Sequence, residues 1–506
     1  MTVPTPVTPI DPRPGGTVDH LAGTSVPVDA ELARRLAEVC SEVSDLDETR
    51  AEAARDWWPL AIGWAARGEV PARPAVVARP TGTDQVAAVL ALCHHHRVPV
   101  TPAGGRSGVC GASIPLFGGV ALDLCGLSGL GEVDPESLVA DLRAGTFGPD
   151  VESGLRDGYS LTLGHWPQSM DLSTVGGWLA CRGAGQYSNR YGKIEDMVIG
   201  LEVVLADGQV VRTGGLAPRS ATGPDLTQLF VGSEGTLGVI TEGRFRVRPV
   251  PEGEGRRAFG FATFADGLDA CRRILRRGAS PAVLRLYDPT ESARSFDLAG
   301  TNALIVLDEA DPALVDATLA VVDAECATAD LLEEGLVDRW LDHRNDVSAL
   351  VPLWRAGIVV DTIEVAARWR VLPDLYRAVL DALSAVEGTL VASSHQSHAY
   401  TDGACLYFTF AGRPPGDVDP SDPAHHEWMA SYYRRAWDQV TEVTRAAGGA
   451  ISHHHGIGIN RARFLPEALG AGFGVLASVK QALDPRGILN PGKLGLAGPF
   501  GDAPWP

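Results

Sequence analysis

Positive charge is in short supply in this chain. Its 506 residues include 43 Lys and Arg against 63 Asp and Glu, which gives a formal net charge of −20 at pH 7. Proteins that bind nucleic acid or anionic bilayers present a basic stripe to the phosphates, so this balance argues against both as partners. An anionic small molecule can still bind, but only in a locally basic pocket.

Long apolar runs and paired cysteines are also missing. The chain has no stretch of about 18 apolar residues, the length that a membrane-spanning helix needs. Its 8 cysteines are scattered without a Cys-x-x-Cys pair, which fits reduced thiols better than a disulfide framework or a structural zinc. The segment 1–16 lacks the basic-then-apolar pattern of a signal peptide. Together these absences predict a cytoplasmic protein.

The length and the pattern of elements predict an α+β protein with more than one domain. We predict a disordered arm over 1–25 and an N-terminal helical segment over 26–73. Short strands, helices and glycine loops alternate over 74–250, where two prolines mark a boundary. A second α+β domain follows over 251–420, and a helical segment with a histidine run completes the chain over 421–506.

The most informative stretch is Ser452-His453-His454-His455-Gly456-Ile457-Gly458. Three consecutive imidazoles can place several proton-transfer groups against one ligand, and they are poor packing residues because each buried ring needs its own hydrogen-bond partner. The alternative is a surface run or a chance metal binder, which the apolar approach over 449–451 disfavours. A second run, 94–96, ends a helix predicted over 84–96; imidazolium rings suit that end of a helix, and we interpret this run as solvated.

Three glycine-rich stretches indicate a ligand that is held by backbone contacts. The first, 101–111, follows a predicted strand, and its closely spaced glycines let backbone N–H groups approach an anion. It has neither the Rossmann nor the Walker spacing, and alone it is equally compatible with an ordinary turn. The stretches 168–178 and 232–241 add short polar donors and further glycine turns. A large dinucleotide would require several such contacts from separate loops.

Taken together, these three stretches resemble the flavin-binding domain of the vanillyl-alcohol oxidase / p-cresol methylhydroxylase family. The segments 397–408, 452–458 and 483–494 narrow the resemblance to the alkyldihydroxyacetonephosphate synthase branch, and the similarity covers about residues 70 to 495. The resemblance implies a two-lobed FAD-binding domain of the p-cresol methylhydroxylase (PCMH) type and an antiparallel, ferredoxin-like cap domain for the substrate. It also implies a C-terminal segment that returns to the flavin, and a homodimer.

The same resemblance implies the cofactor and its contacts. The pyrophosphate of FAD is expected at Gly104–Cys110, and the flavin and adenosine at 168–174, 181–184 and 234–240. The expected contacts are Pro102, Gly104, Gly105, Arg106, Ser107, Gly108, Val109, Cys110, Gln168, Ser169, Asp171, Ser173, Thr174, Gly176, Gly177, Arg182, Ala184, Glu234, Gly235, Thr236, Gly238, Val239 and Ile240. Some relatives tether FAD through a histidine in the first loop; this loop has none, so we predict non-covalent FAD.

The resemblance also implies a catalytic set. In the ether-lipid enzymes the flavin N5 attacks the substrate carbon, an acid leaves and a long-chain alcohol replaces it. Such chemistry needs an acid/base group and a cation for the phosphate. By resemblance, Tyr400 and His454 match the catalytic tyrosine and the middle histidine, His453 and His455 flank the latter, and Arg285 matches a substrate-side arginine. From the residues alone, a structural tyrosine at Tyr400 and a surface ion pair at Arg285 stay open.

A competing class uses a metal. FAD-dependent 2-hydroxy-acid dehydrogenases hold it with histidines of a GDGNLH-like segment and the glutamate of an EHGIG-like segment. Here Leu406 and His454 stand at two of those positions, so a ring nitrogen and a hard oxygen ligand are gone, and we predict no metal. The ether-lipid enzymes carry a basic residue where this chain has Ile459-Asn460. Oxidation of a small alcohol or 2-hydroxy acid therefore stays an alternative, as does a non-catalytic flavin-binding scaffold.

Overall fold

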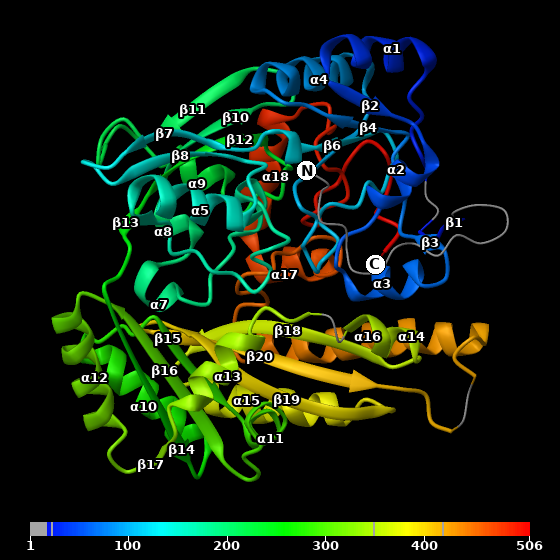
Figure 1. Ribbon diagram of the computed structural model, residues 1–506. Helices are drawn as coiled ribbons and strands as arrows, with labels where there is room; N and C mark the ends of the chain where they lie inside the picture. The colour runs from blue at the N-terminus through cyan, green and yellow to red at the C-terminus, as the bar shows by residue number, and fades with distance from the viewer. Residues whose placement is uncertain (1–17, 22–23, 348–349, 417–418, 506) are drawn as a thin grey trace.

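The computed structural model describes residues 18–21, 24–347, 350–416 and 419–505. Figure 1 shows two lobes, an upper one that contains the N-terminal half and the C-terminal tail, and a lower one built around a broad sheet. Within the described residues, no helix has the length and apolar character needed to cross a bilayer.

The upper lobe contains two sheets with different strand directions. One has four strands in the order β2-β4-β6-β5, and its last three strands are parallel. The other is antiparallel, with five strands in the order β11-β10-β12-β8-β7. The strands are β2 (Glu42–Ser44), β4 (Val76–Arg79), β5 (Val100–Ala103), β6 (Val120–Asp123), β7 (Leu130–Asp134), β8 (Val139–Arg143), β10 (Val198–Val204), β11 (Val210–Gly214) and β12 (Val239–Arg246).

Helices cover these two sheets, and short strand pairs lie at their margins. Strand β6 is buried along its whole length, as expected for a parallel strand between covered faces. The helices are α1 (Ala30–Val39), α2 (Asp47–Glu52), α3 (Pro59–Ala65), α4 (Thr83–His96), α5 (Gly148–Tyr159), α6 (Val175–Cys181), α7 (Ser188–Tyr191), α8 (Ile194–Met197) and α9 (Leu226–Phe230). The pairs are β1 (Val18–Asp19) with β3 (Glu69–Val70), and β9 (Leu161–Thr162) with β13 (Arg248–Pro249).

The lower lobe is a seven-stranded antiparallel sheet in the order β17-β14-β16-β15-β19-β20-β18. Its strands are β14 (Gly253–Phe261), β15 (Val283–Tyr287), β16 (Asn302–Ala310), β17 (Asp330–Leu332), β18 (Val359–Arg368), β19 (Thr389–Ala399) and β20 (Gly403–Gly412). Its helices are α10 (Phe264–Arg276), α11 (Pro289–Phe296), α12 (Pro312–Glu325), α13 (Gly335–His343), α14 (Leu350–Arg355) and α15 (Leu372–Ser384). The mixed α+β architecture with an antiparallel cap confirms the predicted fold class.

The C-terminal segment belongs to both lobes. Helix α16 (Pro423–Ala446) packs on α15 and β18 of the cap (Figure 1). The chain then passes the histidine run and α17 (Leu465–Leu469) and enters the upper lobe as α18 (Ala471–Leu483). There the buried Lys480 ammonium donates hydrogen bonds to the carbonyls of Thr236 and Leu489, at 2.8 Å each. The predicted return of this segment to the upper lobe is confirmed.

The short helix α7 of the upper lobe holds the cap in place. Arg190 donates to both carboxylate oxygens of Asp308 on β16, at 2.7 and 2.6 Å, and the Asp308 side chain is fully buried. The next residue, Tyr191, donates its hydroxyl to Glu309 at 2.5 Å. A bidentate guanidinium–carboxylate pair is strongly directional, so it fixes how the cap sits on the upper lobe.

Two predictions about the N-terminal region need correction. The disordered arm over 1–25 is wrong at its end, because β1 pairs with β3 and the His20 ring stacks on Trp64 at 4.1 Å; residues 1–17, 22 and 23 lie outside the described part. The helical segment over 26–73 also supplies β2, which extends the four-stranded sheet. A strand of three residues is too short to give a periodic signal.

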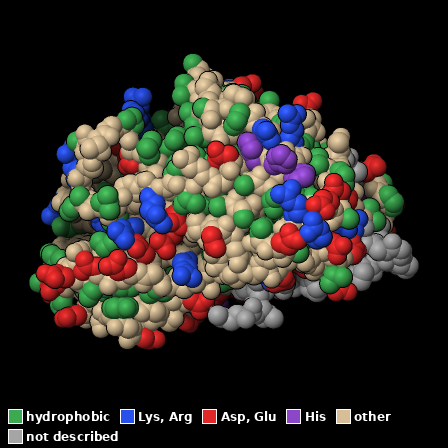
Figure 2. All heavy atoms as spheres, turned by 90° about the horizontal axis from the view of Figure 1, so that it is seen from above, with side chains coloured by type: hydrophobic (Ala, Val, Ile, Leu, Met, Phe, Trp, Pro, Cys, Tyr) green, Lys and Arg blue, Asp and Glu red, His purple; other side chains and the backbone are tan. Residues whose placement is uncertain are grey.

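The first histidine run lies on the surface, as predicted. Helix α4 ends at His96, and His95 is exposed while the two flanking rings are half-buried. Figure 2 shows a group of histidine side chains beside Lys or Arg on this face. The run at 94–96 therefore differs from the run at 453–455, as the sequence analysis predicted.

Candidate flavin and substrate site

The three glycine-rich stretches meet in the upper lobe. A Cβ on Gly104 would lie 2.1 Å from Thr174 Oγ1, and one on Gly105 would lie 2.0 Å from the carbonyl oxygen of Leu172. The third stretch contacts the first at Gly235, which has a φ of +71°. A Cβ on Gly235 would lie 2.4 Å from the Pro102 side chain. Glycine is needed at these contacts, because any side chain would separate the loops.

Buried polar atoms without partners line this meeting point. Among the described residues, nothing bonds to Thr174 Oγ1, Arg106 Nε or Ser113 Oγ, although all three atoms are buried. An unpaired buried polar group costs about 1–3 kcal/mol, so such a group indicates a ligand. Gly108 is open on its side-chain face, where a Cβ would meet only Asp56 Oδ2 at 3.7 Å. Closely approaching backbone and unused donors suit a dinucleotide with many polar groups.

Several predicted cofactor contacts use their side chains elsewhere. Ser173 accepts a hydrogen bond from the Trp178 indole at 2.6 Å, and Thr236 donates to the carbonyl of Ser233 at 2.7 Å. Val239 and Ile240 are buried in the core on β12. These four side chains are thus engaged in hydrogen bonds or in packing within the chain.

Two charged predicted contacts are also engaged within the chain. The buried Glu234 carboxylate accepts hydrogen bonds from the backbone N–H groups of Ile457 at 2.6 Å and Gly458 at 2.8 Å. It thus ties the third glycine stretch to the turn after the histidine run. Arg182 is exposed and pairs with Glu195 at 3.2 Å. Gln168 and Asp171 are exposed, and the roles of all these residues in FAD binding stay predictions.

The first glycine loop also contacts the histidine segment. The Cys110 carbonyl accepts hydrogen bonds from the backbone N–H groups of Ile459 and Asn460, at 2.9 and 3.1 Å. A Cβ on Gly458 would lie 2.1 Å from that same oxygen. The loop predicted to hold pyrophosphate and the segment predicted to hold the catalytic imidazoles are therefore hydrogen-bonded neighbours.

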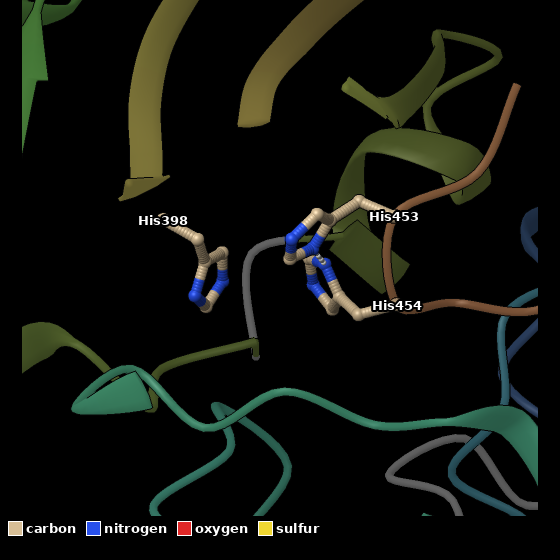
Figure 3. A group of neighbouring side chains, drawn as sticks. All are labelled: His398, His453 and His454. Atoms are coloured by element: carbon tan, nitrogen blue, oxygen red, sulfur yellow. Dashed lines mark hydrogen bonds between the residues drawn. The ribbon is translucent and has the colours of Figure 1, made fainter. Parts of the chain in front are cut away.

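Tyr400 and the histidine run come together as predicted. The Tyr400 hydroxyl lies 2.6 Å from His453 Nε2, and His453 Nδ1 lies 2.9 Å from His454 Nδ1. This forms a line of hydrogen bonds from the phenol to the middle imidazole. His398, at the end of β19, completes the group: its ring stacks on His453 at 4.8 Å, and Ser188 lies 2.7 Å from its Nδ1. Figure 3 shows the three rings converging from two different segments.

The site keeps its imidazoles neutral and its phenol protonated at neutral pH. Burial lowers the pKa of His453 to about 4. Burial, reinforced by the neighbouring imidazoles, lowers the pKa of His398 and His454 well below the usual value. Burial, followed by the charge of Cys405, raises the pKa of Tyr400. A protonated acid thus lies directly against neutral bases, which is the arrangement that proton transfer needs.

The histidine group has the spacing of a metal site. One nitrogen from each of His398, His453 and His454 lies within 4.8 Å of the others. However, both nitrogens of His453 and one of His398 already bond to neighbours within the chain. A metal would have to displace such bonds and would find no carboxylate in the group. The absence of a metal stays a prediction.

A buried ion pair that the sequence analysis missed shapes the histidine run. Glu364 Oε1, on β18, accepts hydrogen bonds from three consecutive backbone N–H groups, those of residues 453, 454 and 455, at 3.1, 3.1 and 2.8 Å. Arg461 bonds to both Glu364 carboxylate oxygens and also donates to the Gly456 carbonyl at 2.8 Å. Burial opposes ionisation of Glu364, but Arg461 and then His455 lower its pKa well below the usual range.

Arg285 is buried, so the alternative of a surface ion pair is wrong. Its side chain lies on β15, the residue is 8% exposed, and the guanidinium lies over the Trp340 ring at 5.5 Å. Its Nη2 lies 2.7 Å from His395 Nε2. Among the described residues, no carboxylate forms an ion pair with Arg285. Its charge also contributes to the lowered pKa of His398, so the cation acts on the histidine group.

Comparison with known proteins identifies the family. A model of the FAD binding domain matches residues 74–214, and a model of FAD linked oxidases, C-terminal domain, matches residues 251–494. The chain is 30% identical over 438 residues to the uncharacterized FAD-linked oxidoreductase YgcU of Escherichia coli (strain K12), covering 83% of this chain and 89% of YgcU. This chain belongs to the FAD-linked oxidoreductase family. FAD is its cofactor.

Two further similar proteins have names that denote different activities. Glycolate oxidase subunit GlcD of Bacillus subtilis (strain 168) is 28% identical over 450 residues, which cover 86% of this chain and 92% of GlcD. A solved structure of alkyldihydroxyacetonephosphate synthase superposes with a TM-score of 0.76 at 25% identity, covering 96% of this chain and 90% of that one. These matches support an FAD-dependent enzyme and span two reaction types.

Proposed function

We propose that this enzyme exchanges an acyl group for an alkoxy group on a ketone phosphate, the reaction type of alkyldihydroxyacetonephosphate synthase. The observation that carries the proposal is the hydrogen-bonded line from Tyr400 through His453 to His454, with the buried cation Arg285 joined to the same group by contacts through His395 and Tyr407. A redox-neutral exchange needs a proton given to one oxygen and taken from another, and a cation for the phosphate.

The roles of the residues follow from their protonation. FAD, when bound, supplies the flavin N5 as the nucleophile for the substrate carbon. Tyr400 enters as a neutral phenol and donates its proton to the oxygen of the departing acyl group. His453 accepts the hydroxyl proton of the incoming alcohol at Nε2, exchanges protons with His454 through their 2.9 Å contact, and returns one proton to the Tyr400 oxygen. The incoming alcohol returns one proton to this line, so the pair ends the cycle as it began.

A labelling experiment tests this proposal. The FAD-loaded protein is incubated without oxygen with an acylated ketone phosphate and a labelled long-chain alcohol. The expected result is label in the phosphate product, release of one fatty acid per label incorporated, and an unchanged visible flavin band at completion. Absence of labelled product, together with bleaching of that band by a simple hydroxy compound, would refute the exchange.

One observation favours oxidation as a second candidate function. Ile459-Asn460 stands where the ether-lipid enzymes carry a basic residue; both residues are fully buried here, and Ile459 packs against Gly111. A phosphate site would thus lack one of its cations. In this alternative, His453 takes the proton of a small alcohol or 2-hydroxy acid while the flavin is reduced. The same anaerobic experiment separates the two candidates, because only oxidation bleaches the flavin. A cytoplasmic location and a homodimer stay predictions.

A further inference from the structure

A buried hydrogen-bond chain lies behind Arg285, on the cap side of the site. His395, on β19, sits between Arg285 and Glu291 of α11: its Nε2 is 2.7 Å from Arg285 Nη2, and its Nδ1 is 2.7 Å from Glu291 Oε2. The Tyr287 hydroxyl accepts from Arg285 Nε at 3.1 Å. The guanidinium is thus held at two of its three nitrogens.

The bonding pattern fixes the protonation of His395. A guanidinium can only donate, so Arg285 requires an unprotonated Nε2 on His395. The imidazole must then carry its proton on Nδ1 and donate it to the Glu291 carboxylate. That carboxylate is well satisfied, because it also accepts from the hydroxyls of Ser393 at 3.1 Å and Thr409 at 3.0 Å. The chain therefore holds a neutral imidazole between a cation and an anion.

This spacer keeps the Glu291 carboxylate out of direct contact with the Arg285 guanidinium. A carboxylate in direct contact would form a bidentate pair and occupy the donors that an incoming oxyanion needs. The neutral ring fixes the guanidinium without neutralising it. In a chain with a formal net charge of −20, a buried arginine without a carboxylate partner among the described residues is a costly arrangement, and a bound anion would compensate it.

A second guanidinium lies on the same indole. Arg344 lies over the Trp340 ring at 5.6 Å, compared with 5.5 Å for Arg285, and over Tyr187 of the upper lobe at 5.0 Å. Trp166 lies beside Arg344, with its ring centroid 5.8 Å from the guanidinium carbon. The buried Trp166 Nε1 has no hydrogen-bond partner among the described residues. Two cations and an unused donor thus gather between the cap and the upper lobe.

The chain behind Arg285 also touches the catalytic group. The His395 ring stacks on Tyr407 at 4.9 Å, and Tyr407 stacks on His454 at 6.1 Å. The rings are tilted by only 22° and 23° from one another. The position of His395 is therefore coupled by direct packing to the imidazoles that are proposed to transfer protons.

We propose that Glu291 and His395 are positioning residues that hold Arg285, with Arg344 beside it, as the binding site for the oxyanion of the substrate, a phosphate or a carboxylate. The proposal deepens the proposed function, because it assigns the substrate class to residues of the same site. Neither Glu291 nor His395 touches the reacting atoms in this scheme; both act through Arg285.

Anion binding to the FAD-loaded protein tests the inference without any turnover. Inorganic phosphate and acetate are titrated separately by calorimetry. The anion that binds more tightly indicates whether the substrate carries a phosphate or a carboxylate at this site. Arg285→Gln and His395→Phe are each expected to weaken that binding at least about tenfold, as expected for loss of a charge-assisted hydrogen bond. His395→Gln is expected to stay within about threefold, since an amide can accept from Arg285 and donate to Glu291.

Controls separate positioning from folding. Asp288→Asn is the matched control: Asp288 is a buried carboxylate that caps the same helix, α11, but is not bonded to His395. It is expected to leave anion binding unchanged, and every variant is checked for FAD content and thermal midpoint. The inference is overturned if neither anion binds, if Arg285→Gln binds as the native protein does, or if His395→Phe and His395→Gln behave alike. Anion binding that follows the expected series while alcohol exchange fails would refute the proposed function and leave this inference standing.

Discussion

Replacing Glu364 by glutamine should destabilise the histidine segment more than any surface change. The carboxylate accepts from three backbone N–H groups and bonds to a fully buried arginine, Arg461. Glu364→Gln keeps the size of the side chain and one acceptor oxygen but leaves the guanidinium charge uncompensated. Breaking a buried pair from one side costs about 3–5 kcal/mol, so we expect a loss of stability of that order.

The assay is thermal unfolding of the FAD-loaded protein, followed by the rise of flavin fluorescence as the cofactor is released. Glu364→Gln is expected to release FAD at a clearly lower temperature. Glu467→Gln removes a carboxylate from an exposed pair with Arg445 and is expected to leave the midpoint unchanged. Identical midpoints for both variants would show that Glu364 does not hold the segment, and would refute the reasoning.

The pH dependence of this contribution has a definite sign. The folded-state pKa of Glu364 lies below its unfolded value, so the folded state favours the ionised form. The stability gained is fully present above the unfolded pKa, near 4.5, and is lost as the pH falls through the folded value. The difference between the native protein and Glu364→Gln is therefore expected to be constant from neutral pH to about pH 5 and to shrink in acid.

Three further predictions concern the cofactor and the chemistry. Tyr400→Phe is expected to lower turnover by about 10²–10⁴-fold with FAD content unchanged, and the acid limb of the native pH–rate profile is expected near 4, where His453 becomes protonated; unchanged turnover would show that Tyr400 is not the acid. Gly105→Ala is expected to abolish FAD retention on gel filtration, because its Cβ would lie 2.0 Å from the backbone carbonyl oxygen of Leu172. Acid precipitation is expected to leave all flavin in the supernatant, whereas a yellow pellet would show a covalent flavin. EDTA is expected to leave turnover unchanged, whereas activity that is lost to EDTA and restored by a divalent ion would show a metal.

The sequence was sufficient for the parts of the site that depend on local backbone. Glycine stretches predict close approaches of loops, and the structure brings Gly104, Gly105 and Gly235 into such contacts. The meeting of Tyr400 with His453 followed from the resemblance and is confirmed in the geometry. Element boundaries also agreed where the periodic pattern was long: the helix predicted over 84–96 is α4, Thr83–His96.

The residues that sequence reasoning missed act across long separations. Glu364 lies 89 positions before His453, and Ser188 lies 210 positions before His398. Each is one polar residue in a strand or a short helix, and no local pattern indicates its partner. Glu364 alone offered a signal, since it is a charged residue among the apolar residues of β18. The burial of Arg285 likewise depends on the cap sheet and could not be read from its own strand.

The route of the C-terminal segment has a consequence for how the holoenzyme is made. The loop at Gly104 is synthesised early, but Asn490, which bonds to the carbonyls of Ala112 and Glu234, follows it by more than half of the chain. At about 5–20 residues per second, the emerging chain spends tens of seconds with an unfinished cradle. Capture of FAD is therefore expected only after Asn490 has emerged, and chains stalled before the histidine run should be colourless.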